Sequence, residues 1–223
     1  GCAVVVREAS MKALIFANGE PNNGPMVQRA LSQARDDASY IVIAADGGAR
    51  IAGYFGLKID QLVGDMDSLT ADEVAAFTRD GVHVHRFPPE KNQTDLELAL
   101  YQAREDGCEW IRIVGGLGGR FDQMMANVYL MALPELADCD LEMVAGKQSL
   151  RILHPGLHSI SGAPDDTISL IPLKGDVTGI VTDGLQYALH DETLSFGPAR
   201  GVSNVMQAAT ASVSLASGLL LLV

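Results

Sequence analysis

The feature that most constrains the fold is a regular alternation of short apolar segments and helical patterns that starts at Met11. The segments expected to form strands are 13–17, 40–45, 62–63, 82–87, 110–114 and 141–144, and helical patterns cover about 26–35, 49–54, 70–79, 94–105 and 123–132. Two of the helices open with Thr-x-x-Glu capping-box spacing, at Thr70 and at Thr94. Strands that alternate with helices of this length indicate a mostly parallel sheet with helices on both faces. We therefore expect a Rossmann-like α/β domain over residues 11–145.

The pattern changes after Gly146. Short β segments follow at 149–153, 167–171, 177–181 and 211–215, separated by turns, and no helical pattern remains. The apolar end, 218–223, is too short to span a bilayer and is expected to be a final core strand. This arrangement predicts a small all-β sandwich domain over residues 146–223. Met11 is expected to be the natural first residue, with residues 1–10 not native.

The charge and the cysteines narrow the classes of partner. The chain has 223 residues and a net charge of −12, which argues against nucleic acid and anionic membranes as partners. A phosphorylated substrate stays possible, because a bound divalent metal reverses the sign of a local acidic cluster. The three cysteines are scattered and have no Cys-x-x-Cys spacing, which favours reduced thiols and a cytoplasmic location.

Two carboxylates, Asp65 and Asp67, follow an expected strand within Gly64-Asp65-Met66-Asp67-Ser68. In open α/β sheets, ligands bind just past the carboxyl ends of the strands. On extended backbone, residues i and i+2 point to the same side, so the two carboxylates could converge on one hard cation. Such pairs also cap helices or lie on solvated turns, and the motif alone leaves both interpretations open.

Carboxylates also lie near the ends of other expected strands, at Asp46, Asp95 and Asp122. Each could simply begin a turn or stabilise a helix N-terminus, an effect worth about 0.3–1 kcal/mol. Carboxylates at so many strand ends of one sheet share an edge, however, and they would repel one another unless a metal ion lay between them. The set as a whole favours a metal site.

The run Gly115-Gly116-Leu117-Gly118-Gly119 has the composition of a phosphate-binding loop. Glycines let backbone N–H groups approach phosphate oxygens, and the next helix presents its positive end to them. Arg120 and Lys91 supply cations. The run lacks the Lys-Ser/Thr ending of a P-loop. It also follows the fifth expected strand, whereas the dinucleotide fingerprint follows the first, so a nicotinamide enzyme is disfavoured.

Together these residues resemble the thiamine pyrophosphokinase family, also called thiamine diphosphokinase. The motifs that carry the resemblance occur in order from Met11 onward: 45–49 (Ala-Asp-Gly-Gly-Ala), 64–68, 91–97, 115–123, 194–197 (Leu-Ser-Phe-Gly) and 201–204 (Gly-Val-Ser-Asn). The resemblance implies transfer of the β,γ-diphosphate of ATP to the hydroxyl of thiamine, giving thiamine diphosphate and AMP. It also implies Mg²⁺ as cofactor and a homodimer.

The resemblance implies a role for each matching residue. Asp65, Asp67 and Asp95 would be the catalytic Mg²⁺ ligands, with Asp46 in the same cleft. Ser203 and Asn204 would bind thiamine across a dimer interface. The residues implied to hold ATP are Lys91, Thr94, Gly116, Gly118, Arg120, Asp122 and Gln123.

One departure concerns Asn92, which stands where many relatives have Asp, so one carboxylate of the usual cluster is missing. The thiamine hydroxyl would attack the β-phosphorus in line, with catalysis chiefly from positioning and charge neutralisation. No general base is evident, and Asp95 is the candidate.

Two alternatives remain open at this stage. A metal-dependent nucleotide phosphohydrolase would use the same Asp-x-Asp pair but would release phosphate without thiamine. A non-catalytic thiamine or nucleotide sensor would use the β domain for dimerisation and leave the carboxylates as helix caps. Thiamine-dependent release of AMP separates the three.

Overall fold

A computed structural model of the chain describes residues 11–36 and 39–223. They form two compact units that divide between Gln148 and Ser149. The domain limits expected from the sequence, 11–145 and 146–223, put the boundary three residues earlier. The expectation about residues 1–10 lies outside the described residues.

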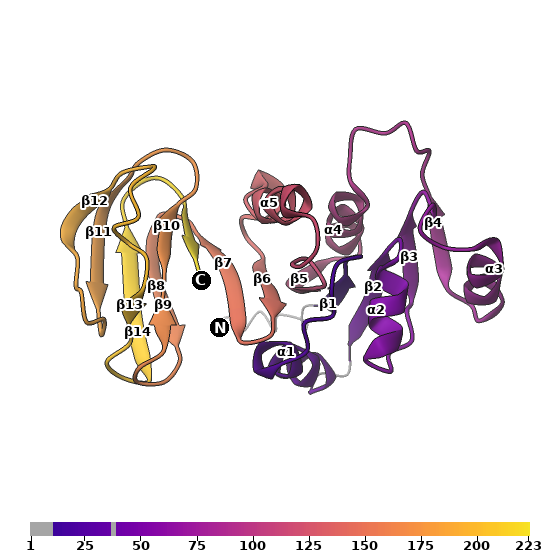
Figure 1. The fold of residues 1–223 in the computed structure, drawn as a ribbon, viewed down its shortest axis with the longest axis horizontal. Helices are drawn as coiled ribbons and strands as arrows, with labels where there is room; N and C mark the ends of the chain where they lie inside the picture. Colours follow the sequence, from indigo (N-terminus) through magenta and orange to yellow (C-terminus); the bar gives the residue numbers. More distant parts are fainter. Residues whose placement is uncertain (1–10, 37–38) are drawn as a thin grey trace, which may run out of the picture. The chain divides into compact units, whose positions relative to one another are not determined.

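The first unit is an α/β layer structure (Figure 1). Its strands pair in the order β6-β5-β1-β2-β3-β4, and every pairing among them is parallel. The α/β fold expected from the alternating pattern is confirmed. The elements are β1 (Met11–Phe16), α1 (Pro25–Arg35), β2 (Tyr40–Ala45), α2 (Gly48–Tyr54), β3 (Gln61–Gly64), α3 (Ala71–Arg79), β4 (His83–Arg86), α4 (Asp95–Glu105), β5 (Cys108–Val114), α5 (Phe121–Leu130), a 3₁₀ turn (Pro134–Leu136) and β6 (Asp140–Ala145).

The strand order determines which helices cover which face. From β1 the chain moves stepwise to β4, then returns past β1 to β5 and β6. Right-handed crossovers then place α1, α2 and α3 on one face and α4 and α5 on the other. Figure 1 shows α1 and α4 on opposite sides of the sheet.

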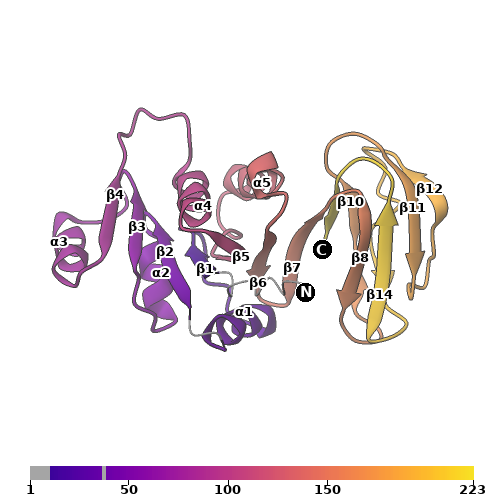
Figure 2. The same ribbon diagram turned by 180° about the vertical axis from the view of Figure 1, so that it is seen from behind.

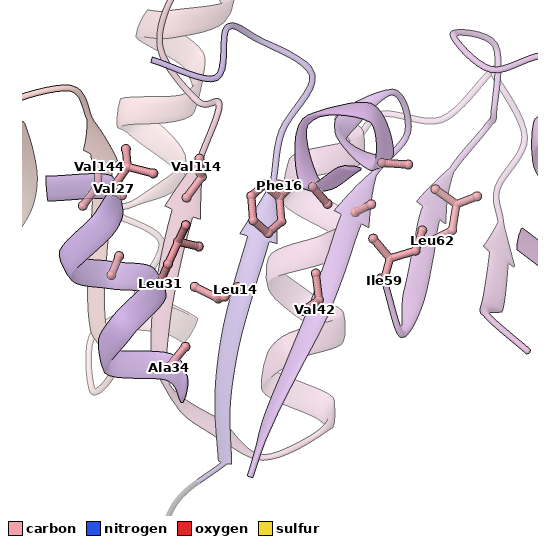
Figure 3. Packing of buried hydrophobic residues seen from close by; sticks show 14 of the residues in the cluster. Leu14, Phe16, Val27, Leu31, Ala34, Val42, Ile59, Leu62, Val114 and Val144 are labelled. Carbon is pink, nitrogen blue, oxygen red and sulfur yellow. The ribbon is translucent and has the colours of Figure 1, made fainter. Parts of the chain in front are cut away.

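The core follows the two-residue period of the strands. Leu14 and Phe16 of β1 pack with Val27 and Leu31 of α1 in a fully buried cluster (Figure 3). Ile15, which is equally buried, points to the other face. On that side α4 contacts β1, β2, β3 and β5. Both faces are therefore covered, which explains why these strands are apolar at consecutive positions.

Two threonines cap helices at the edge where the site lies. Thr70 and Glu73 form the complete capping box that the sequence predicts. Thr94 accepts a hydrogen bond from the Glu97 N–H at 3.2 Å, but the second box is only half formed. The Glu97 carboxylate accepts instead from the Tyr101 hydroxyl, one turn later. The capping-box prediction is therefore correct for α3 and only partly correct for α4.

The second unit consists of antiparallel sheets around its own core (Figure 2). One sheet has the order β12-β11-β14-β8, β15 pairs with both β7 and β10, and β9 pairs with β13. Core residues such as Leu153, Leu170, Ile180 and Val213 come from both main sheets, as in a sandwich. The strands are β7 (Gln148–Leu153), β8 (Gly156–Ser161), β9 (Thr167–Ile168), β10 (Leu170–Pro172), β11 (Val177–Asp183), β12 (His190–Leu194), β13 (Asn204–Val205), β14 (Thr210–Leu215) and β15 (Leu220–Leu222).

The single strand expected at 167–171 is in fact two. The chain breaks at Ser169, so that β9 pairs with β13 while β10 pairs with β15. Among the described residues, no helix is long and apolar enough to cross a membrane.

Candidate functional site

A cavity of about 700 Å³ lies at the carboxyl ends of β1 to β5. The loops that follow these five strands supply its lining, within residues 17–20, 45–46, 65–68, 89–96 and 115–127. β1 and β5 are neighbours where the strand order reverses, which is the position at which open α/β sheets bind ligands. The topology therefore gathers five loops around one opening.

Three carboxylates meet in this cavity. Asp46, Asp65 and Asp67 each place an oxygen within 4.8 Å of the others. Asp46 follows β2 in the left-handed region, with φ 47°, and its side chain is buried, at 3% exposure of the residue. Its Oδ1 atom has no hydrogen-bond partner. Asp65 Oδ1 accepts a hydrogen bond from the Asp67 backbone N–H at 3.2 Å, which ties the two acidic residues together.

A hard divalent cation fits this cluster. The cluster offers only oxygen donors, which Mg²⁺ prefers. The buried Asp46 oxygen without a partner is costly, and a cation beside it would offset that cost. Asp65 and Asp67 are expected here from the sequence. Asp46, expected only in the same cleft, joins them as the third member.

Asp95, the other expected metal ligand, has a different neighbour. Lys91 Nζ lies 2.8 Å from Asp95 Oδ1 and 3.4 Å from Asp65 Oδ2. Burial raises the pKa of Asp95, and the Lys91 ammonium opposes that rise. The pKa of Lys91 is also raised. Burial is the largest single influence and lowers this pKa, but the Asp95 and Asp65 carboxylates together outweigh it. Lys91 thus bridges Asp95 to the three-carboxylate cluster.

The glycine-rich loop after β5 is held by its carbonyl groups. The Gly115 carbonyl accepts from the Gly19 N–H at 2.9 Å, and the Gly116 carbonyl accepts from Asn127 Nδ2 at 2.8 Å. The Leu117 carbonyl accepts from Asn22 Nδ2 at 3.0 Å. Three successive carbonyls are therefore satisfied by the protein. The Gly118 N–H donates to Met124 Sδ at 3.0 Å, and the rest of the loop is suited to presenting N–H groups to an anion in the cavity.

The residues that follow the loop stand at the mouth of the cavity. Arg120 and Gln123 line it, as does Thr94 from the opposite side. Asp122 does not line it but forms a two-atom ion pair with Arg120, at 2.5 and 3.1 Å. The Arg120 guanidinium accordingly holds the pKa of Asp122 below its usual range. Asp122 is thus placed to orient Arg120 rather than to touch a ligand in the cavity.

The structure adds residues that the sequence analysis missed. Asn18 donates to Ser68 Oγ at 3.1 Å, and Ser68 donates to Asp67 Oδ1 at 3.2 Å, so this chain orients an acidic residue of the cluster. Asn18 and Ser68 both follow strands, and a search of all strand ends for polar residues would have found them. Asn127 lies within α5, where no local pattern sets it apart.

The second unit has a smaller cavity, of about 310 Å³. Tyr187, Leu189, Arg200 and Asn204 are among its lining residues. The Asn204 side chain bonds both backbone groups of Tyr187: it accepts from the N–H at 3.0 Å and donates to the carbonyl at 2.8 Å. Of the two residues expected to bind substrate, Asn204 therefore shapes the cavity by holding Tyr187.

Ser203 differs from its neighbour. It is exposed, with φ 62°, and is not part of the cavity lining. Its backbone N–H donates to Ser169 Oγ at 3.2 Å. The two expected substrate residues thus adjoin one cavity, but only Asn204 reaches it.

The fold and the larger cavity define a class: an α/β protein with a ligand-sized cavity at the carboxyl ends of its strands, beside three carboxylates that could hold a metal ion. Comparison with known protein families identifies the family within this class. The family model for the thiamin pyrophosphokinase catalytic domain matches residues 32–143. The model for the thiamin pyrophosphokinase vitamin B1 binding domain matches residues 157–220. The chain belongs to the thiamin pyrophosphokinase family.

Individual relatives agree with this assignment. The chain is 28% identical over 188 residues to a thiamine pyrophosphokinase of Bacillus subtilis, covering 84% of this chain and 88% of the relative. The crystal structure of thiamine pyrophosphokinase from Bacillus subtilis superposes with a TM-score of 0.82 at 25% identity, covering 95% of this chain and 97% of that one. That of the Geobacillus thermodenitrificans protein gives 0.80 at 26% identity, covering 95% and 96%.

Proposed function

We propose that this protein transfers the diphosphate group of ATP to the hydroxyl of thiamine, giving thiamine diphosphate and AMP. One observation carries the proposal: each family match covers one of the two cavities, the larger one except for its lining residues 17–20. The catalytic-domain match spans the acidic cluster and the glycine-rich loop. The vitamin B1 binding match spans the cavity that Tyr187 and Asn204 line.

Mg²⁺ would be held by Asp46, Asp65 and Asp67, with Asp95 beside them. When bound, the ion would neutralise phosphate charge and polarise the phosphorus–oxygen bonds. The support is the oxygen-only donor set and the unpartnered Asp46 oxygen. Asn92, which stands next to Lys91, does not line the cavity. Three acidic donors are present without a carboxylate at this position.

The phosphates of ATP would lie against the glycine-rich loop, including Gly116 and Gly118. Lys91 and Thr94 would contact them from the β4–α4 loop, and Arg120 and Gln123 from the start of α5. These positions surround the cavity, so a triphosphate within it would meet donors on both sides. Asp122 would keep the Arg120 guanidinium in a fixed orientation.

The chemical step needs little covalent help from the protein. The thiamine oxygen attacks the β-phosphorus in line, and the bond from that phosphorus to the α-phosphate oxygen breaks, so AMP leaves. In such a transfer, positioning and charge neutralisation supply most of the rate enhancement. Asp95 is the candidate acceptor for the hydroxyl proton, because its pKa is raised and it lines the cavity.

Thiamine would be bound by the second unit, with Asn204 shaping the cavity and Ser203 at its edge. We also propose that the protein acts as a homodimer. Of the eight large hydrophobic side chains that are exposed among the described residues, five belong to this unit: Leu157, Val181, Tyr187, Phe196 and Val202. A dimer interface formed by this unit would cover these side chains. A cytoplasmic location fits the free thiols of Cys108 and Cys139.

The test is AMP formation from Mg-ATP with and without thiamine, with thiamine diphosphate followed by chromatography. Equal amounts of AMP and thiamine diphosphate, formed only when thiamine is present, are the expected result. Phosphate release that is indifferent to thiamine would instead indicate a phosphohydrolase. Tight thiamine binding without turnover would indicate a sensor. Either outcome would overturn the proposal.

A further inference from the structure

Lys91 is the cation nearest the acidic cluster among the described residues, and it is well buried. Its side chain is only 10% exposed, and those of its partners Asp65 and Asp95 are 12% and 25% exposed. It reaches both carboxylates from the β4–α4 loop, four residues before Asp95. A buried ammonium between two carboxylates is held more firmly than a surface pair, because water screens it less.

Asp65 is shared between two environments. One of its oxygens pairs with Lys91, and Asp65 also belongs to the cluster with Asp46 and Asp67. A metal ion in that cluster and the ammonium would therefore draw on the same carboxylate. Two cations so close repel each other, so Lys91 in this position weakens the binding of a metal ion.

Asp95 lies next to the cluster but does not belong to it. A Cβ atom on Gly64 would be 2.9 Å from Asp95 Cγ and 3.3 Å from Asp46 Cβ, so the Asp95 carboxyl group occupies space that only glycine leaves open. With φ 145°, Gly64 also has a backbone that other residues rarely adopt. Asp95 is thus within reach of the metal site, while its charge is engaged by Lys91.

We propose that Lys91 is a resident counter-ion that couples metal binding to nucleotide binding. Without ligands it neutralises Asp65 and Asp95 and keeps metal affinity low. When a nucleoside triphosphate enters, its phosphates take over the ammonium, so that Asp65 becomes fully available to the metal and Asp95 is released from its ion pair. The inference rests on one part of the proposed function, namely that this cavity binds a divalent cation and a nucleoside triphosphate. By linkage, the nucleotide must also bind more tightly when the metal is present.

Calorimetric titration of the nucleotide-free protein with Mn²⁺ tests this directly. Lys91→Met should bind Mn²⁺ about tenfold more tightly than wild type, because the repelling charge is gone. Lys91→Gln is a second variant of the same kind, and Lys91→Arg, which keeps the charge, should match wild type. The control is Lys58→Met, which makes the same change in net charge at an exposed lysine before β3, at the opposite end of the strand.

With saturating α,β-methylene ATP, which cannot be cleaved between its α and β phosphates, the gain should disappear. Equal or weaker Mn²⁺ binding by the nucleotide-free Lys91→Met and Lys91→Gln proteins would overturn the proposal. So would an equal gain in Lys58→Met. These outcomes concern binding alone, so thiamine diphosphate formation by wild type would stand or fall separately.

A second measurement follows Lys91 in the wild-type protein. The lysines of the wild-type protein are labelled by reductive ¹³C-dimethylation, and the Lys91 signal is assigned by its loss in Lys91→Arg. The signal should shift when α,β-methylene ATP is added without metal, since the ammonium changes partners. An unchanged signal at saturating nucleotide would overturn the counter-ion role.

Discussion

Replacing Asp46 by asparagine should raise stability and weaken metal binding at the same time. Asp46 is 3% exposed, its Oδ1 atom has no hydrogen-bond partner, and a carboxylate oxygen lies within 4.8 Å of oxygens of two other carboxylates. Asparagine has the same shape and tolerates the positive φ of 47° at this position. Its amide can donate to the neighbouring carboxylates, and the substitution removes one like charge from the cluster.

The magnitude follows from the cost of a buried acceptor without a partner, about 1–3 kcal/mol. Since asparagine recovers only part of that cost, we expect Asp46→Asn to raise the free energy of unfolding by about 1 kcal/mol in a chelator. For a chain of this size that corresponds to roughly 2–4 °C in Tm. Loss of a charged ligand should weaken Mn²⁺ binding by at least about tenfold, as is typical for metal sites that lose a supporting group.

The assay is thermal unfolding in EDTA followed by the fluorescence of Trp110. It is the single tryptophan of the chain and lies on β5, so it reports on the first unit. Asp80→Asn, at the exposed end of α3, makes the same change in net charge far from the cluster and should leave Mn²⁺ affinity unchanged. An Asp46→Asn protein that is less stable than wild type in EDTA, or that binds Mn²⁺ equally well, would refute the reasoning.

Three further predictions test separate parts of the account. Asp67→Asn should lower kcat by about a hundredfold or more while thiamine binding, measured by calorimetry, changes little; equal losses in both would argue against a metal-ligand role. Thr70→Ala and Thr94→Ala each remove an N-cap bond of 3.2 Å and should each cost about 1 kcal/mol of stability, but only Thr94→Ala, in the cavity, should reduce turnover. Equal turnover in the two would show that Thr94 is only a cap. The Arg50 hydrogen bond lowers the pKa of Glu73 to about 2, so its stabilising effect is present above pH 4.5 and is lost as the pH falls toward 2. Glu73→Gln should therefore be less stable than wild type at pH 7 and approach it in acid unfolding below pH 4.5; a difference that persists at pH 2 would contradict this.

The sequence predicts the first unit well because its signals are local. Strands with consecutive apolar residues and helices with caps alternate at regular spacing, and a parallel sheet is the arrangement that covers both faces. The second unit is harder to predict. β12 has one buried residue in five and β13 has two residues in all, so neither has a periodic pattern to detect. β13 also pairs with β9, more than thirty residues earlier in the chain, which no local pattern can report.

Part of the candidate site could likewise be predicted from the sequence, and part could not. Topology brings strand ends together, so Asp46, Asp65 and Asp67 could be predicted to meet from their positions after strands. The pairing of Asp95 with Lys91 depends on side-chain conformation and on the space beside Gly64, which no sequence pattern reports.

Transfer of the whole diphosphate group is the central claim, and isotope labelling tests it most directly. The protein is incubated with thiamine and Mg-ATP labelled with ³²P at the β position in one sample and at the γ position in another. We predict that both labels appear in thiamine diphosphate in equal yield, with unlabelled AMP. Release of the γ label as inorganic phosphate, with the β label left in ADP and none in a thiamine product, would contradict the account.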